Sequence, residues 1–165
     1  MTPTKDRPII GWREWVGLPE LGVAWVKAKV DTGARSSSLH AWDVEVDGAL
    51  GVVRFGVHPF QNDDEITTSV TAPLVETRDV RSSNGEVETR PVISTRIVVA
   101  GFVVPIELTL SARDEMGFRM LLGRTAVRRR FVIDPGRSFR GGGDRAHPPG
   151  AEPGTDAGTV ESGLH

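Results

Sequence analysis

Val30-Asp31-Thr32-Gly33-Ala34 follows directly on the apolar run Ala24-Trp25-Val26-Lys27-Ala28-Lys29, so a strand candidate delivers one aspartate into a tight Thr-Gly turn. Glycine allows the backbone conformations that such a turn needs, and the carboxylate is then held in one place. Asp, Thr and Gly are also ordinary turn residues, and alone this stretch is structural more often than functional. A second signal is therefore needed.

The second signal is Met120-Leu121-Leu122-Gly123-Arg124, a short apolar run that ends in glycine. A helix-compatible segment, residues 125–130, follows it, and Phe131-Val132-Ile133-Asp134-Pro135 then predicts a final strand closed by proline. At 165 residues the chain suits a single domain that contains both signals.

Together these stretches resemble a group of bacterial proteins, the retropepsin-like aspartic peptidases long labelled ATP-dependent zinc proteases and found near ATP-grasp ligases of the RimK type. The resemblance covers about residues 9–139 and rests on the stretches 10–16, 28–41, 54–59, 90–93 and 120–124. It implies that the Leu-Leu-Gly strand passes behind the Asp-Thr-Gly turn and supports it.

Between Leu18 and Leu110 short β-rich runs alternate with turn residues, and helical periodicity is nearly absent. We expect strands at residues 24–30, 42–46, 52–57, 66–72, 74–80, 86–94, 95–100 and 103–110. Asn84-Gly85 predicts a type I′ hairpin turn. The expected fold class is all-β, a closed β-barrel with one short helix near the C-terminal end of the core, and the resemblance makes it retropepsin-like.

Three segments are expected along the chain: a flexible N-terminus at 1–8, a retropepsin-like aspartic peptidase domain at 9–139, and a disordered tail at 140–165. The tail is rich in Gly and Pro and has almost no large apolar side chains. It is predicted to be disordered because burial cannot offset its ordering entropy.

Composition limits the partners. The net charge of −2, from 20 Lys plus Arg and 22 Asp plus Glu, gives no basic footprint for nucleic acid and no polybasic patch for a membrane. Cysteine is absent, which excludes disulfides, thiolate metal ligands and a Cys nucleophile. No apolar signal segment or spanning run is visible, so we expect a cytoplasmic protein.

The resemblance implies a catalytic role for Asp31, Thr32 and Gly33. Aspartic peptidase chemistry needs two acids that share one proton and a water, and this chain carries a single Asp-Thr-Gly turn. A homodimer would supply the second Asp31, and the pair would titrate in two coupled steps. Thr32 would hydrogen-bond across the dimer axis, and Gly33 would allow close backbone approach.

A flexible hairpin should cover such a site, and residues 74–93, turning at Asn84 and Gly85, are the candidate flap; the acidic stretch 59–65 is the alternative lid. Substrate contacts are expected at Ala34, Arg35, Asn84, Gly85 and Arg124. Viral retropepsins commonly carry an acidic residue at the position that Arg35 occupies here. That acid pairs with the arginine that corresponds to Arg124. Asp114 or Glu115 could replace that acid, or both arginines could face a peptide or protein substrate, glutamate-rich in the RimK context.

We expect neither metal nor cofactor. The chain has no His-Glu-x-x-His helix and no phosphate-binding glycine loop, so the zinc and ATP labels find no motif. Two other hypotheses remain: a non-catalytic peptide-binding barrel of the same fold, and a zinc hydrolase built on His40, His58 and Asp43.

Overall fold

The computed structural model describes residues 6–59, 67–82, 84–112 and 117–150. Within these ranges the chain consists of β-strands with one short α-helix and one 3-10 turn, so the expected all-β class with a short late helix is confirmed. Residues 1–5 of the expected flexible N-terminus and residues 60–65 of the alternative lid lie outside the described ranges.

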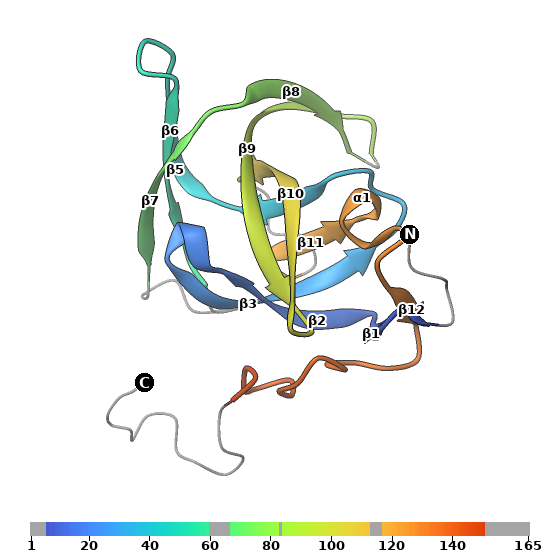
Figure 1. Ribbon diagram of the computed structural model, residues 1–165. Helices are drawn as coiled ribbons and strands as arrows, with labels where there is room; N and C mark the ends of the chain where they lie inside the picture. The colour runs from blue at the N-terminus through green and yellow to red at the C-terminus, as the bar shows by residue number, and fades with distance from the viewer. Residues whose placement is uncertain (1–5, 60–66, 83, 113–116, 151–165) are drawn as a thin grey trace.

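The strands follow one another along the chain with short connections (Figure 1). They are β1 (Ile9–Gly11), β2 (Arg13–Leu18), β3 (Val23–Asp31), β4 (Ser37–His40), β5 (Trp42–Asp47), β6 (Val52–Val57), β7 (Thr68–Pro73), β8 (Glu76–Arg81), β9 (Val87–Val99), β10 (Phe102–Ser111), β11 (Met120–Gly123) and β12 (Val132–Asp134). The 3-10 turn η2 (Pro19–Leu21) joins β2 to β3, and helix α1 (Arg124–Val127) follows β11.

Strand β3 forms because its side chains alternate in character. Val26 and Ala28 are buried in the core, whereas Lys27 and Lys29, which alternate with them, are half-buried. This period of two is the pattern of a strand with one buried face. The strand ends at Asp31, and the chain turns there.

The main sheet has seven strands in the order β10-β4-β11-β3-β2-β9-β8. Strand β9 also pairs with β10, so the first and sixth strands of this order are hydrogen-bonded to each other. Strand β11 runs parallel to β3, which brings chain segments far apart in sequence side by side at the sheet centre. Strands β1 and β12 form a separate parallel pair.

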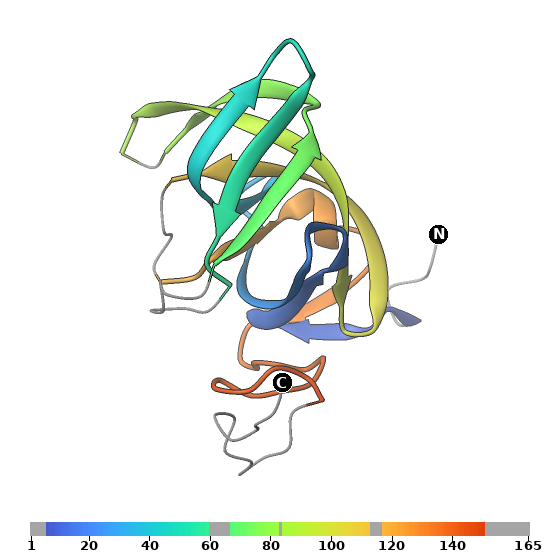
Figure 2. The same cartoon turned by 90° about the vertical axis from the view of Figure 1, so that its left-hand side faces the viewer.

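A second sheet stands against the first and consists of β5, β6 and β7 in antiparallel order (Figure 2). Its inner side chains join the same core as the main sheet, among them Val53, Phe55 and Val70. One continuous apolar cluster therefore underlies both sheets, and it supplies most of the free energy that holds the strands together.

Several expected strands differ from the observed ones. Residues 86–94 and 95–100 form the single strand β9, because no turn residue interrupts the run between Ser94 and Thr95. Strands β1, β2 and β4 were not expected. Five of the six residues of β2 are buried, so it lacks the alternation that marks a half-exposed strand, and β4 is only four residues long.

Residues 137–150 form an extended segment, here called the strap, that runs along β2 and β3. Glu14 in β2 is 1% exposed, and its carboxylate accepts hydrogen bonds from the backbone N–H groups of Gly11, Arg140 and Gly141 at 2.6, 2.8 and 2.9 Å. These donors offset the cost of burying the charge. Further along, the Trp15 indole donates to the carbonyl of Asp144 at 2.8 Å.

The strap differs from the expectation of a disordered tail that begins at residue 140. Its composition is poor in apolar side chains, but it is held by backbone groups and by turn-forming contacts such as Asp144 Oδ1 with the N–H of Ala146. Residues 151–165 of the expected tail lie outside the described ranges.

Candidate active site

The Asp-Thr-Gly turn lies at the end of β3, and residues 31–36 are here called the acidic loop. Asp31 Oδ1 accepts a hydrogen bond from the N–H of Gly33 at 3.0 Å, and the Asp31 carbonyl accepts one from Ala34 at 3.2 Å. The carboxylate therefore caps its own turn, and its side chain is half-buried rather than sealed in the core. The sequence places one carboxylate in a fixed, accessible position.

Strand β11 supports the loop from behind, as the resemblance implied. Leu122 pairs with Val30 and Gly123 pairs with Asp31 in parallel register. The N–H of Gly123 donates to Ser37 Oγ at 3.0 Å. A Cβ at position 123 would lie 2.8 Å from the Ser37 nitrogen and closer still to the Ser36 carbonyl, so only glycine fits this approach.

The start of α1 holds the far side of the acidic loop. The N–H of Arg124 donates to the carbonyl of Ala34 at 2.7 Å, and Thr125 donates to the carbonyl of Arg35 through its N–H at 3.1 Å and its hydroxyl at 2.9 Å. The Arg124 guanidinium donates to the carbonyl of Thr32 at 3.0 Å. The Arg124 side chain thus braces the loop through a backbone carbonyl.

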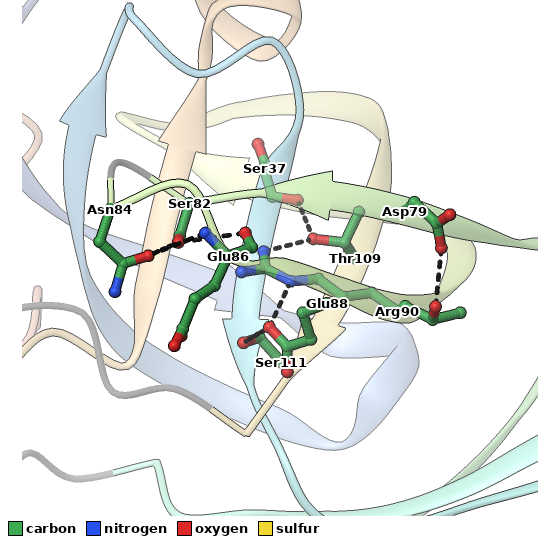
Figure 3. Close-up of polar contacts among 10 residues, drawn as sticks. Ser37, Asp79, Ser82, Asn84, Glu86, Glu88, Arg90, Thr109 and Ser111 are labelled. Carbon is green, nitrogen blue, oxygen red and sulfur yellow. Dashed lines mark hydrogen bonds and ion pairs between the residues drawn. The ribbon is translucent and has the colours of Figure 1, made fainter.

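The hairpin of β8 and β9 extends over the acidic loop, at the place where the flap was expected (Figure 1). Its turn spans Ser82 to Glu86, with the N–H of Ser82 bonded to the carbonyl of Glu86 at 2.8 Å and the N–H of Gly85 to the carbonyl of Ser82 at 3.0 Å. The predicted two-residue type I′ turn is wrong, because the hydrogen bonds join Ser82 to Glu86 and leave three residues between them, with Gly85 at φ +90°. Asn84 instead caps the turn through Oδ1 and the N–H of Glu86 at 3.1 Å (Figure 3).

Polar contacts connect the base of the flap to the support of the acidic loop (Figure 3). Arg90 in β9 is 7% exposed; its Nε donates to Glu88 at 2.9 Å and its Nη1 reaches the Thr109 hydroxyl at 3.5 Å. Thr109 donates in turn to the carbonyl of Ser37 at 3.3 Å, and Ser37 Oγ accepts from Gly123. The flap base and the Leu-Leu-Gly strand are therefore coupled by one buried chain of hydrogen bonds.

A pocket of about 490 Å³ lies between the acidic loop and the flap. Asp31 opens into it together with Gly33, Ala34 and Arg35. The opposite wall comes from the flap, and the remaining residues that line the pocket are Ser36, Ser38, Arg78, Asp79, Val80, Arg81, Ser82, Arg90, Thr109 and Leu121. Four arginines and two aspartates line the pocket, so its walls favour an anionic or hydrogen-bonding ligand.

The structure brings some of the expected substrate residues together and not others. Ala34 and Arg35 line the pocket with Asp31, whereas Asn84, Gly85 and Arg124 are not among the residues that line it. Thr32 is exposed at the loop tip. Asp114 and Glu115, the alternative partners of Arg124, lie outside the described ranges.

Sequence reasoning missed the arginines of the flap itself. Arg78 and Arg81 from β8 and Arg90 from β9 all line the pocket. The charged run 76–81 in the expected flap strand was the signal that could have found them, because the inner side chains of a flap lie against the site that it covers. Arg78 donates to Glu76, and at 3.0 Å to Glu107, and these hydrogen bonds raise the pKa of its guanidinium.

The histidine hypothesis finds no support in the geometry. Among the described residues, no three His, Cys, Asp or Glu side chains come close enough to hold a metal ion. His58 stacks on Trp42 with ring centroids 5.3 Å apart. The half-buried His40 lines neither the pocket nor a metal cluster, and its buried Nδ1 has no hydrogen-bond partner in the described part of the chain.

Fold and site define a class: an all-β domain with an Asp-Thr-Gly turn at a strand end, a Leu-Leu-Gly strand and short helix behind it, and a hairpin in front. Residues 9–141 match the family described as RimB-like, retropepsin-like aspartic endopeptidase RimB. The match spans well over half of the chain, so the chain belongs to the RimB-like family of retropepsin-like aspartic endopeptidases.

Relatives with other names share this region. A protein of Shewanella halifaxensis named "Probable alpha-L-glutamate ligase" is 44% identical over 133 residues, which is 79% of this chain and 29% of the relative. One of the same name from Parasynechococcus marenigrum is 46% identical over 130 residues, 77% of this chain and 28% of the relative. The chain thus spans less than a third of these relatives.

A solved structure shares the fold. The crystal structure of a protein of unknown function from Legionella pneumophila superposes with a TM-score of 0.66 at 27% identity, covering 81% of this chain and 98% of that chain. In the described part of the present chain, no helix has the length and apolar character needed to span a membrane.

Proposed function

We propose that this chain is a homodimeric aspartic endopeptidase in which Asp31 of each protomer forms one half of a catalytic dyad. One carboxylate would be ionised and accept a proton from the attacking water, and the other would be protonated and polarise the peptide carbonyl. Thr32, at the exposed loop tip, would bond across the two-fold axis. In this proposal the strand pairings, β9 with β10 included, form the barrel of a retropepsin.

The observation that carries the proposal is the placement of Asp31. Its carboxylate opens into the pocket beneath the flap, while Gly123 and α1 fix the loop from behind. A purely structural Asp-Thr-Gly turn would require neither a pocket in front of the carboxylate nor a covering hairpin. The match of residues 9–141 to an aspartic endopeptidase family agrees with this reading.

The substrate we propose is an acidic peptide or protein segment. Arg35 on the acidic loop and Arg81 on the flap both line the pocket, and neither has a carboxylate partner among the described residues. Arg81 bonds to the neutral carbonyl of Gly85 at 2.9 Å and so keeps its charge uncompensated. Two such cations on opposite walls would favour glutamate or aspartate side chains on each side of the scissile bond.

The ligase name is not transferred to this chain. It is given to whole proteins of which the matched region is 29% or less, whereas the family match over residues 9–141 describes an endopeptidase. The name nevertheless supports the substrate proposal, because a protein that joins glutamate and a protein that cuts acidic peptides would both act on glutamate-containing molecules.

The test is a mass-spectrometric cleavage profile of purified protein on a diverse peptide pool that includes glutamate-rich peptides. Asp31→Asn should abolish cleavage while the fold is kept. Asp47→Asn is the matched control: Asp47 caps the β5–β6 turn far from the pocket, so the same charge change there should leave the rate unaltered. Retained cleavage in Asp31→Asn would refute the mechanism, and no cleavage by any variant would favour the non-catalytic binding barrel.

A further inference from the structure

Strand β8 forms the outer edge of the flap and is the last strand of the main sheet. Its backbone pairs with β9 alone within the described ranges. The Thr89 hydroxyl in β9 donates a hydrogen bond to the Asp79 carboxylate in β8 at 2.7 Å, so this contact joins the two strands of the hairpin to each other. Among the residues that the structure describes, the side-chain hydrogen bonds from β8 to the body of the molecule are made by Arg78 alone.

Arg78 reaches two separate parts of the body. Its Nη2 lies 3.0 Å from Glu107 Oε1 in β10, and its Nη1 lies 3.3 Å from Ser36 Oγ in the acidic loop. Glu76, two residues earlier on the same face of β8, pairs with the same guanidinium. The side chain of Arg78 is 30% exposed and that of Glu107 52%, so water can compete for the pair.

This contact also divides the space beneath the flap. Arg78 lines the pocket that contains Asp31, and Glu107 lines a neighbouring pocket of about 330 Å³. Arg35 and Ser36 line both pockets. The ion pair of Arg78 with Glu107 therefore lies between two pockets that have Arg35 and Ser36 in common.

We propose that Arg78, Glu107 and Ser36 form a latch that holds the flap down over Asp31, and that its release joins the two pockets into one groove able to admit an extended chain. Arg78 is in this role a positioning residue, because it acts on the hairpin rather than on the reacting atoms. The use of the groove for a peptide rests on the proposed function, whereas the latch itself is a property of the fold. Partly exposed ion pairs contribute little individually, so loss of the latch should raise the ratio of open to closed flap about two- to fivefold.

The absence of cysteine allows a direct test. Spin labels at Val87→Cys, near the flap tip, and Val103→Cys, on the hairpin between β9 and β10, would report the flap position as a distance distribution; both side chains are exposed, at 53% and 64%. Arg78→Gln and Glu107→Gln should each enrich a second distance population about two- to fivefold. The exchange Arg78→Glu with Glu107→Arg should shift the distribution back toward the parent.

Arg54→Gln is the matched control, since it removes an arginine paired with Glu45 and Asp47 on the other sheet and should leave the distances unaltered. Unchanged distributions in both Arg78→Gln and Glu107→Gln would overturn the latch. If Arg78 instead bound substrate directly, Arg78→Gln would raise the KM for peptide without altering the distances, and the exchanged pair would not restore that KM. The distance measurement needs no substrate, so it tests the latch alone. Failure of the peptidase proposal would show separately, as cleavage that is the same in the parent and in Asp31→Asn.

Discussion

At Gly123 the support strand and the acidic loop meet with no room for a side chain. The nearest atoms to a Cβ at this position are backbone atoms of Ser36 and Ser37, which cannot rotate away. Gly123 also pairs with Asp31 itself in the β3–β11 register. Any shift that relieves a clash at Gly123 must therefore displace the residue in front of it.

Gly123→Ala is expected to lower the free energy of unfolding by about 1–3 kcal/mol, because a methyl group would be forced against fixed backbone. Urea denaturation measures the loss. Gly48→Ala is the control, since no atom lies within 4 Å of a Cβ there and its backbone conformation suits alanine. Equal stability of the two variants would mean that the loop and strand are not in the close contact described.

The sequence and the resemblance located the two stretches that meet at the candidate site, but not the partners of each residue. The Asp-Thr-Gly and Leu-Leu-Gly stretches were found from the sequence because strand, turn and glycine leave local signals. The partner of Arg124 was not, because it is the carbonyl of Thr32, and every residue carries a carbonyl. The role of Arg78 was missed for a related reason: its contacts join β8 to β10 and to the acidic loop, and neither pairing is visible in the order of residues.

At the scale of elements, the strap shows how a segment of low apolar content can be held in place. Two backbone N–H groups of the strap donate to the buried Glu14 carboxylate, and one backbone carbonyl of the strap accepts a hydrogen bond from the Trp15 indole. Amino-acid composition predicts disorder for such a segment because it reflects only how much apolar side chain can be buried. The contacts that hold the strap are made by backbone groups, which every sequence has. The flap is the opposite case: its strands were predictable from β-rich runs, and only the turn type was wrong.

The strap should loosen in acid through Asp144. Hydrogen bonds from the backbone N–H groups of Ala146 and, next, His147 lower the pKa of the Asp144 carboxyl from its ordinary value of 3.8. A carboxyl with a lowered pKa in the folded state stabilises that state fully above its unfolded value, and the contribution is lost as the pH falls through the folded pKa. Protection of the strap should therefore persist at neutral pH and fall below about pH 4.

Asp144→Asn isolates this charge, since the amide oxygen can still accept from Ala146. The variant should be cut by trypsin after Arg145 faster than the parent at neutral pH. A denaturation series in which the stability difference between parent and variant stays constant from about pH 6 to about pH 3 would contradict the assignment, because the carboxyl of the unfolded parent chain takes up its proton in that range while the folded one, with its lowered pKa, does so only at lower pH.

At the scale of the whole molecule, the chain offers one Asp-Thr-Gly turn and so half of the proposed dyad. Light scattering should show twice the 17.9 kDa chain mass at micromolar concentration under conditions that support cleavage. A strict monomer that cleaves peptides with dependence on Asp31 would show that the second acid comes from elsewhere. A single sequence carries no mark of two copies pairing beyond this missing carboxylate, so the proposed dimer rests on the chemistry of the dyad and not on a sequence pattern.

Strands β1 and β12 lie parallel, with Ile9 opposite Val132 and Gly11 opposite Asp134, and the strap beyond β12 is fastened to Glu14. A force applied between the two ends of the domain would pull these strands along their length in opposite directions. Such a load acts on all of their hydrogen bonds together rather than opening them one at a time, so resistance to traction depends on the unfolding barrier and not on equilibrium stability alone. The domain is in this sense mechanically fastened where its first and last strands pair, and a machine that threads it from its C-terminal side would have to shear this pair after detaching the strap.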